Sequence, residues 1–376
     1  MSAPTTLTGS VVGPDAITPA TVTVSDGRIA TVTPLPAGTP APDHYVLPGF
    51  VDLHVHGGDG AAFDDGAEAA RRVIDRHRRH GTTTMLASLV TAAPAALTER
   101  IRALGELVDA GELAGLHLEG PFLAESRCGA HDPGQLQAPT AAAVEALLAA
   151  GAGRVRMITL APELPGGLAA VERIVAAGVV AAVGHTDATV AQTRAAFDAG
   201  ARVATHLANG MRPLHHRDGG PVAAALLDDR VAAEIIADGE HVAPEMIAVF
   251  ARLLGPDRLV LVTDAMAAAG APDGRYSLGG LQVEVADRQA RVIGPDGSSG
   301  SLAGSTLTMD AAVRGAVAAG VSLVDAVRAA TLTPATVLGL GDSHGAVLPG
   351  RVADLVVTDR DLRPTAVLRH GIWSER

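Results

Sequence analysis

Eight short apolar runs, separated by alanine-rich stretches of helical composition, are the feature that most constrains the fold of this chain. A strand buried on both faces of a parallel sheet reads as a short apolar run, and helices connect such strands. Eight strands are the number that closes a β/α barrel. We therefore predict an α/β fold with a (β/α)8 TIM-type barrel. The apolar runs lie at residues 46–53, 82–90, 113–118, 155–160, 179–184, 202–205, 232–237 and 258–263, and the helical stretches include 67–79, 95–110, 140–150 and 189–199.

The two ends of the chain have a β-like sequence pattern that differs from the alternating apolar and helical pattern of the middle. Residues 21–24 and 353–358 are β-like, and turn signals such as Ser25-Asp26-Gly27 lie beside them. Terminal segments often meet in space when a larger domain is inserted between them. We expect a small β-sandwich built from both ends, and a barrel that carries a β-hairpin insertion after its eighth strand. The expected ranges are 1–47 and 346–376 for the small domain, 48–345 for the barrel and about 276–300 for the hairpin.

Charge and cysteine content exclude several classes of protein. The formal net charge is −12, whereas nucleic-acid-binding surfaces concentrate Lys and Arg to meet phosphates. Cys128 is the single cysteine, so an internal disulfide is excluded, which fits a reducing compartment. The sequence shows no signal-peptide pattern and no apolar run of roughly 18 residues, the length of a membrane-spanning helix. We expect a cytoplasmic protein that binds neither nucleic acid nor membrane.

Metal-capable side chains stand where several of the apolar runs end. His54 and His56 are two residues apart at the end of the first run, and on an extended strand both point to the same face. Glu119 ends the third run, and His185 and His206 end the fifth and sixth. The C-terminal ends of barrel strands form the face that carries the active site. Because a buried Glu needs a cation, and a Glu with two His leaves coordination open for water, these residues predict a catalytic divalent metal centre.

Asp264 ends the eighth run and belongs to the same face of the predicted barrel. A carboxylate that faces metal-activated water can accept a proton as the nucleophile forms, and can return that proton to a leaving amine. His117 precedes Glu119 by two residues and shares its face, and we interpret it as a neighbour of the metal centre rather than a ligand. The residues favour a metal-dependent hydrolase in which Asp264 acts as general base and then as general acid.

The same residues lie in motifs that resemble the amidohydrolase superfamily and, more narrowly, the N-acetylglucosamine-6-phosphate deacetylases. The His-x-His pair marks only the superfamily, whereas His-Leu-Glu-Gly-Pro followed by Gly-Ala-His is specific to the narrower group. The motifs run in family order over nearly the whole chain. They are Pro48-Gly49-Phe50-Val51-Asp52-Leu53-His54-Val55-His56-Gly57, His117-Leu118-Glu119-Gly120-Pro121-Phe122, Gly129-Ala130-His131, Gly184-His185-Thr186, Thr205-His206-Leu207, Ala237-Asp238-Gly239-Glu240-His241-Val242, Thr263-Asp264-Ala265-Met266 and Leu302-Ala303-Gly304-Ser305.

The resemblance implies a barrel with a small β-sandwich, a homodimer, and hydrolysis of N-acetylglucosamine 6-phosphate to glucosamine 6-phosphate and acetate. It implies that Glu119, His185 and His206 bind a divalent metal ion. His54 and His56 are both present, so a second ion bridged by Glu119 is expected as well, giving one or two ions per subunit. Zn is the expected metal, with Fe, Mn or Co as alternatives, because Glu and His ligands accept all of them.

The resemblance also implies roles for residues around the metal. Asp264 is then the acid/base residue, and His131 donates a hydrogen bond to the developing oxyanion. Arg217 and His241 are the candidates for the phosphate, since Arg suits bidentate oxyanion binding. The implied substrate contacts are Ala130, His131, Asn209, Gly210, Arg217, His241, Leu302, Ala303 and Gly304.

Two positions depart from the family pattern. After the sixth run the family has an aromatic residue and Ala, where this chain reads Leu207-Ala208-Asn209-Gly210-Met211. This departure leaves the sugar specificity open, including N-acetylgalactosamine 6-phosphate as the alternative substrate. Cys128 stands where a Lys is expected before Gly-Ala-His, and on a mobile active-site loop it could contact substrate or metal.

Two other functions remain alternatives at this point. Amidohydrolases that act on cyclic amides, such as dihydroorotases and hydantoinases, typically use a carboxylated Lys at the end of the fourth strand, where this chain reads Thr159-Leu160-Ala161-Pro162-Glu163. A catalytically silent barrel used as a scaffold is expected to have lost metal ligands or the Asp, and this chain keeps them. Both observations favour the deacetylase.

Overall fold

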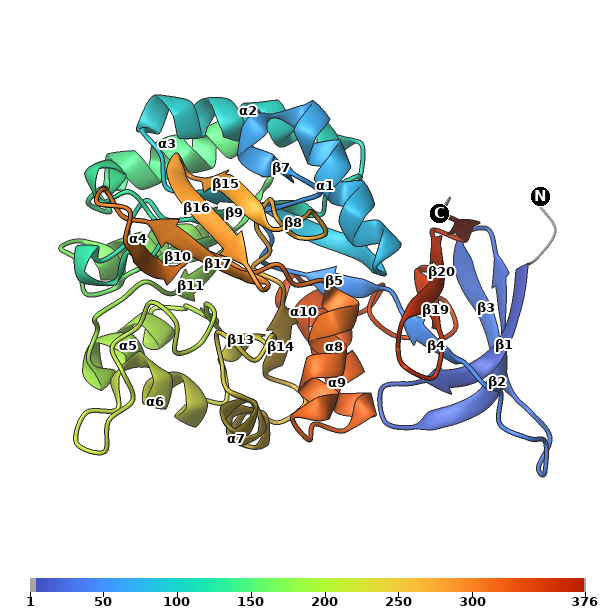
Figure 1. Ribbon diagram of the computed structural model, residues 1–376. Helices are drawn as coiled ribbons and strands as arrows, with labels where there is room; N and C mark the ends of the chain where they lie inside the picture. The colour runs from blue at the N-terminus through green and yellow to red at the C-terminus, as the bar shows by residue number, and fades with distance from the viewer. Residues whose placement is uncertain (1–4, 375–376) are drawn as a thin grey trace.

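The computed structural model describes residues 5–374 and places them in two parts (Figure 1). A barrel of parallel strands surrounded by helices forms the larger part, and a separate sheet lies at its side. Both ends of the chain contribute strands to the separate sheet. The predicted barrel and the small β domain built from both ends are confirmed, and the strands expected to form a β-sandwich belong to one seven-stranded sheet. The division into domains at the expected boundaries stays a prediction.

Eight parallel strands form the barrel sheet, in the order β14-β13-β12-β11-β10-β9-β8-β5. Each predicted apolar run supplies one of them. The two outer strands meet just beyond their ends, where Val55 and Ala265 form a parallel bridge and the Asp264 N–H donates to the His54 carbonyl over 2.8 Å. This contact closes the barrel. The strands are β5 (Phe50–Asp52), β8 (Thr82–Val90), β9 (Gly115–Glu119), β10 (Val155–Leu160), β11 (Val180–Val183), β12 (Val203–Ala204), β13 (Ala232–Ile236) and β14 (Leu259–Val262).

The first apolar run, 46–53, is divided between the two sheets. Tyr45–Pro48 forms β4 of the separate sheet and Phe50–Asp52 forms β5 of the barrel, with Gly49 between them. A Cβ at Gly49 would collide with Thr83 Oγ1, so a larger residue does not fit at this crossing. The expectation of one continuous barrel strand was wrong, because an apolar run indicates burial but not which of two sheets buries it.

Helices cover the outside of the barrel and bury apolar faces against it (Figure 1). In α1, Ala70, Val73 and Ile74 are buried at helical spacing. The four predicted helical stretches lie within one residue of α1, α2, α3 and α5. None of the helices formed by residues 5–374 has the length and apolar character needed to cross a membrane. The helices are α1 (Ala67–Arg79), α2 (Pro94–Asp109), α3 (Ala141–Gly151), α4 (Gly167–Ala176), α5 (Val190–Asp198), α6 (Gly220–Leu227), α7 (Pro244–Leu254), α8 (Met309–Ala318), α9 (Leu323–Ala329) and α10 (Leu332–Val337), with short 3-10 turns at Phe63–Asp65, Glu125–Arg127 and Pro133–Gln135.

A buried ion pair holds α8 against the residue that follows α1. Asp310 is 3% exposed, and its carboxylate accepts from His80 Nδ1 at 2.9 Å and from Arg314 Nη1 at 2.7 Å. Burial raises the pKa of Asp310, but the contacts with His80, Thr308 and Arg314 outweigh burial and bring that pKa to about 2. The charged form of Asp310 therefore stabilises the fold.

We expect Asp310→Asn to lower the free energy of unfolding by roughly 2 kcal/mol at pH 7. Because the folded pKa of about 2 lies below the ordinary value of 3.8, this stabilisation is complete above about pH 5 and is lost as the pH falls through 2. Urea unfolding of both proteins at pH 7 and pH 3 measures the effect, and the difference should be smaller at pH 3. An equal difference at both pH values contradicts the assignment.

The separate sheet has seven strands in the order β21-β20-β19-β4-β1-β2-β3. Strands β19 and β4 are antiparallel, with Val357 opposite Val46, and so join the two ends of the chain. The sheet has its own apolar core, which includes Val22, Ile29 and Leu355. The strands are β1 (Thr5–Val12), β2 (Ile17–Ser25), β3 (Arg28–Pro34), β4 (Tyr45–Pro48), β19 (Leu355–Thr358), β20 (Pro364–Arg369) and β21 (Ile372–Trp373).

An insertion follows the last barrel strand and lies over the barrel (Figure 1). The segment expected to form a hairpin supplies the two central strands of a four-stranded antiparallel sheet. The apolar face of this sheet packs on Val90, Ala130 and Met266, which belong to the barrel and its loops. The four strands are β15 (Gly274–Leu278), β16 (Leu281–Ala286), β17 (Gln289–Ile293) and β18 (Ser299–Leu302), and a further pair, β6 (Gly57–Gly58) and β7 (Ala61–Ala62), follows β5.

Candidate metal centre

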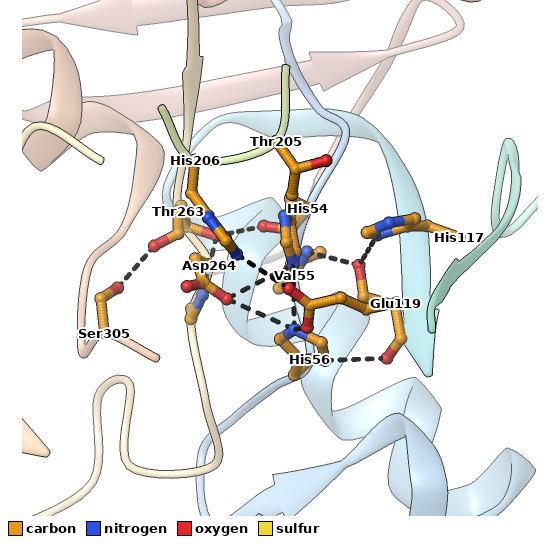
Figure 2. Close-up of polar contacts among 12 residues, drawn as sticks. His54, Val55, His56, His117, Glu119, Thr205, His206, Thr263, Asp264 and Ser305 are labelled. Carbon is orange, nitrogen blue, oxygen red and sulfur yellow. Dashed lines mark hydrogen bonds and ion pairs between the residues drawn. The ribbon is translucent and has the colours of Figure 1, made fainter. Parts of the chain in front are cut away.

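Polar side chains from five strand ends meet at one mouth of the barrel. Figure 2 shows those of His54, His56, Glu119, His206 and Asp264 turned toward one another. All of them are buried; the exposed fraction is 0% for His54 and 4% for Glu119. The structure therefore brings together every residue for which a metal-ligating or acid/base role was predicted at a strand end. They are His54 and His56 after β5, Glu119 at the end of β9, His185 after β11, His206 after β12 and Asp264 after β14.

Three of these residues have left-handed backbone conformations. The φ angles are +47° at His185, +26° at His206 and +47° at Asp264. Non-glycine residues rarely adopt positive φ, and such backbone strain gathers at functional sites. At each of these residues the backbone turns sharply where the strand ends. The side chains of all three residues reach the cluster at the mouth of the barrel.

Glu119 lies at the centre of the cluster. Its Oε1 is 3.0 Å from His185 Nε2 and 2.9 Å from His206 Nε2. Its Oε2 is 3.2 Å from His56 Nε2. One carboxylate thus faces both the histidines of β11 and β12 and the histidine pair of β5, which is the position a ligand shared by two ions requires.

His54, His56 and Asp264 form the second half of the cluster. Asp264 Oδ1 is 3.5 Å from His54 Nε2 and 3.3 Å from His56 Nε2, and the two Nε2 atoms are 3.0 Å apart. These three residues, and separately Glu119, His131 and His185, each present ligand atoms within 4.8 Å of one another. The described residues therefore contain two neighbouring groups able to hold a cation.

The outer nitrogens of the histidine rings show which atoms face the centre. Nδ1 lies 2.8 Å from the Arg127 carbonyl in His185, 3.1 Å from the Asn209 carbonyl in His206, and 3.2 Å from the Ser88 carbonyl in His56. A carbonyl oxygen only accepts, so each Nδ1 carries a proton and each Nε2 is free to offer its lone pair. Lone pairs and carboxylate oxygens about 3 Å apart repel each other unless a proton or a metal cation lies between them. This donor set fits a divalent metal ion.

The charges within the cluster also favour a bound cation. Burial lowers the pKa of His56, but contacts with Asp264 and Glu119 outweigh burial and raise that pKa to about 9. Burial lowers the pKa of His54 as well, but the charges of Glu119 and Asp264 outweigh burial and raise that pKa well above the ordinary value. The carboxylates thus draw positive charge into the site, and protons supply it when no metal is bound.

We expect the affinity for Zn²⁺ to rise with pH up to about 9, because metal binding must displace the proton that His56 holds below its raised pKa. Each displaced proton makes the affinity about tenfold stronger per pH unit. Competition with a chromophoric chelator at pH 6, 7 and 8 measures this dependence. An affinity that is flat over that range, after correction for the chelator's own protonation, is the contrary result.

The sequence pattern described as the amidohydrolase family matches residues 45–372. The chain belongs to the amidohydrolase family. Among curated relatives, an N-acetylgalactosamine-6-phosphate deacetylase from Escherichia coli O157:H7 is 38% identical over 355 residues, which cover 93% of each chain. An N-acetylglucosamine-6-phosphate deacetylase from Lysinibacillus sphaericus is 38% identical and covers 87% of this chain and 84% of its own. The predicted resemblance is confirmed.

Solved structures agree with this assignment. A mutant of the N-acetyl-D-glucosamine-6-phosphate deacetylase from Mycobacterium smegmatis, in complex with N-acetyl-D-glucosamine-6-phosphate, is 44% identical, with a TM-score of 0.94 over 99% of both chains. The N-acetylglucosamine-6-phosphate deacetylase from Thermotoga maritima is 31% identical, with a TM-score of 0.91 over 99% of this chain and 100% of its own. The amidohydrolase described here therefore shares its whole architecture with these enzymes.

A cavity of about 240 Å³ opens beside this cluster of metal-capable residues. One side of the cavity is formed by His56, Glu119, His185, His206 and Asp264. The inserted sheet adds Leu278 and Ser301 to the wall. Most of the predicted substrate contacts also line the cavity, namely Ala130, His131, Asn209, Gly210, His241, Leu302 and Gly304.

Three predicted contacts do not line this cavity. Arg217 is exposed, and its Nη1 lies 2.8 Å from His216 Nε2 on the surface. Ala303 is buried in the core beneath the inserted sheet. Cys128 is partly buried beside the cavity, and its backbone carbonyl accepts from the His131 N–H. The geometry within this amidohydrolase chain supports none of the three as a direct contact.

Sequence reasoning missed several buried polar residues beneath the candidate metal ligands of this amidohydrolase. Glu234 lies in β13, is 0% exposed, and faces His54 Nδ1 at 3.1 Å. Asp52 accepts from Thr263 Oγ1 at 2.6 Å and from the His54 N–H at 3.2 Å, and so joins the first and last barrel strands. A charged residue inside an otherwise apolar strand was the signal that could have identified Glu234.

Proposed function

We propose that this amidohydrolase hydrolyses the N-acetyl amide of N-acetylglucosamine 6-phosphate to give glucosamine 6-phosphate and acetate. The observation that carries the proposal is the buried cluster of Glu119, His185, His206 and Asp264 on the wall of a single cavity. Relatives and solved structures named for this activity cover most of the chain. Hydrolysis of an amide at a metal centre is the reaction that such a donor set supports.

Glu119, His185 and His206 would hold one divalent ion, and His54 and His56 would hold a second beside the shared Glu119. A bound divalent ion lowers the pKa of water and polarises the acyl oxygen of the substrate. Zn is the metal we propose, with Fe, Mn or Co as alternatives that the same ligands accept. The number of ions per subunit is one or two.

Asp264 is the residue that we propose moves the proton. It lines the cavity, and its Oδ1 lies 3.3 Å from His56 Nε2. Burial raises the pKa of Asp264, but the charges of His54 and His56 outweigh burial and hold that pKa below the ordinary range. Asp264 therefore starts as a carboxylate and can accept a proton. Because an amide nitrogen leaves readily only when protonated, the same side chain then donates that proton to the nitrogen.

His131 is the residue that we propose stabilises the oxyanion. Its Nε2 lies 3.3 Å from Glu119 Oε2, and its ring lines the cavity. Burial lowers the pKa of His131, so its ring is neutral at physiological pH. The Thr91 N–H donates to Nδ1 at 3.4 Å, which places the ring proton on Nε2. A neutral ring with Nε2–H beside the centre can donate to a carbonyl oxygen as charge develops on it.

The phosphate is proposed to lie near His241. This residue lines the cavity, and its Nδ1 lies 2.7 Å from Asp238 Oδ2. Burial lowers the pKa of His241, but the contact with Asp238 outweighs burial and raises that pKa, which favours the cationic ring that a phosphate attracts. Arg217 lies outside the cavity, so its proposed phosphate contact rests on the family resemblance alone.

N-Acetylgalactosamine 6-phosphate is the second candidate substrate, because the relative from Escherichia coli O157:H7 is named for that activity. A cyclic-amide hydrolase with a carboxylated Lys is excluded, since the sequence contains no lysine. We also propose a homodimer and a cytoplasmic location. The first is supported by the family resemblance, and the second by a single cysteine, which fits a reducing compartment.

An acetate-release assay tests the proposed function. It compares N-acetylglucosamine 6-phosphate, its galacto epimer and unphosphorylated N-acetylglucosamine, with elemental analysis of the same protein. We expect the gluco phosphate to be the best substrate and the unphosphorylated sugar the poorest. Equal rates with and without phosphate remove the roles proposed for His241 and Arg217, and no acetate from any of the three substrates overturns the proposal.

A further inference from the structure

A fully buried carboxylate lies below the metal centre, inside a barrel strand. Glu234 is the third residue of β13 (Ala232–Ile236), whose other residues are alanine and isoleucine. Its side chain is 0% exposed, and its only ion-pair partner among residues 5–374 is His54. Burying a charged carboxylate in an apolar strand costs free energy unless its contacts compensate for the lost hydration. The contacts of Glu234 therefore indicate what the residue does.

One oxygen of Glu234 contacts both halves of the cluster. Oε2 lies 3.1 Å from His54 Nδ1 and accepts from the His206 N–H at 3.2 Å. The backbone carbonyl of Glu234 also accepts from the Leu207 N–H at 2.8 Å. The other carboxylate oxygen, Oε1, is buried and has no hydrogen-bond partner among the described residues. The carboxylate charge is therefore directed at His54 and at the His206 turn.

The contact with His54 determines which ring nitrogen is available. A carboxylate accepts, so His54 Nδ1 must donate and its Nε2 keeps a lone pair. That Nε2 is the atom that faces His56, Glu119 and Asp264. A carboxylate behind an imidazole fixes the ring orientation and makes the facing nitrogen a stronger donor to a metal.

The contacts with residues 206 and 207 hold a strained turn. His206 has a φ of +26°, an unfavourable backbone conformation that persists only when surrounding contacts impose it. Glu234 binds two successive N–H groups there, one through its side chain and one through its backbone. Strand β13 lies between β12, which carries His206, and β14, which separates it from β5 and His54.

We propose that Glu234 is a positioning residue that sets the tautomer of His54 and the turn of His206 together, and so couples a proposed ligand of one ion to a proposed ligand of the other. The inference rests on the metal centre of the proposed function and extends it to a residue that does not line the cavity. Its charge, rather than its volume, is the property that matters. The isosteric change Glu234→Gln removes that charge and keeps the shape.

The test measures metal binding and the stability of the metal-free protein separately. Wild-type protein and Glu234→Gln are stripped with chelator and titrated with Zn²⁺ against a chromophoric competitor. We expect the affinity for at least one ion to fall about 10- to 100-fold in the variant. Urea unfolding of the metal-free proteins should show a smaller loss of free energy than the loss of metal-binding free energy, because the amide oxygen of Gln can still accept from the His54 Nδ1–H and the His206 N–H.

Asp310→Asn is the matched control, since it also neutralises a buried carboxylate but lies outside the cluster. It should lose stability and keep its metal affinity. Unchanged metal affinity in Glu234→Gln overturns the proposal, and so does a weaker affinity accompanied by an equal destabilisation of the metal-free protein. Wild-type protein that binds no ion overturns the proposed metal centre together with this inference, whereas metal binding without acetate release affects only the proposed reaction.

Discussion

Asp264→Asn is expected to lower kcat about a thousandfold or more, because general acid–base catalysis contributes up to about 10⁴-fold and this residue is proposed to act in both steps. Asn matches Asp in shape but neither accepts a proton from water nor donates one to the leaving amine. It also tolerates positive φ, so the conformation at this position, with a φ of +47°, should persist. The acetate-release assay measures the loss.

Asp264→Asn should leave the fold and the metal content unchanged. We expect the Asp264→Asn protein to keep the ion held by Glu119, His185 and His206, and to unfold at nearly the wild-type temperature. Elemental analysis and thermal unfolding check both points. Ordinary turnover in a metal-loaded variant would falsify the assignment of Asp264, and loss of the fold would show that the residue has a structural role instead.

Glu119→Gln is expected to abolish activity by a different route, through loss of the metal. The carboxylate of Glu119 faces His185, His206 and His56 at 2.9 to 3.2 Å, so its charge serves both groups. Removing a partner that only orients a ligand weakens metal binding up to about 100-fold, and removing the shared ligand should cost more than that. Chelator competition measures the affinity, and acetate release at limiting Zn²⁺ measures the consequence.

Glu119→Gln and Asp264→Asn are distinguished by how their activity responds to added Zn²⁺. Excess Zn²⁺ should restore part of the activity of Glu119→Gln and none of the activity of Asp264→Asn. Asp310→Asn, which alters a buried carboxylate outside the cluster, should match wild-type protein in metal content. A Glu119→Gln protein that purifies with the wild-type metal content contradicts a ligand role for this residue.

The barrel and its ligands could be predicted because two simple patterns coincide in the sequence. Buried parallel strands are apolar throughout, so a His, Glu or Asp that ends such a run stands out, as Glu119 and Asp264 do. The C-terminal ends of all barrel strands lie on one face, so residues far apart in sequence are expected to meet. The positive φ angles at His185 and His206 could not be predicted, since these are not residues that favour that conformation.

Other features depend on tertiary contacts that no local pattern carries. Glu234 lies within an apolar run, and its role depends on His54, which comes from a distant strand. The outer strands of the insertion, β15 and β18, contain glycine and serine and lack a strong β pattern, so only the central pair was expected. Arg217 shows that a residue assigned to the substrate by family resemblance can lie outside the cavity of its own chain.

The passage of the chain through Gly49 connects the seven-stranded sheet directly to the first barrel strand and the proposed metal site. Strand β19, from the C-terminal end, pairs with β4, which runs through this single glycine into β5 and on to His54. Truncation after residue 345 would leave every proposed ligand in the chain but remove β19, one of the two strands that pair with β4. We therefore expect this truncation to make the positions of His54 and His56 less well fixed before the barrel itself unfolds.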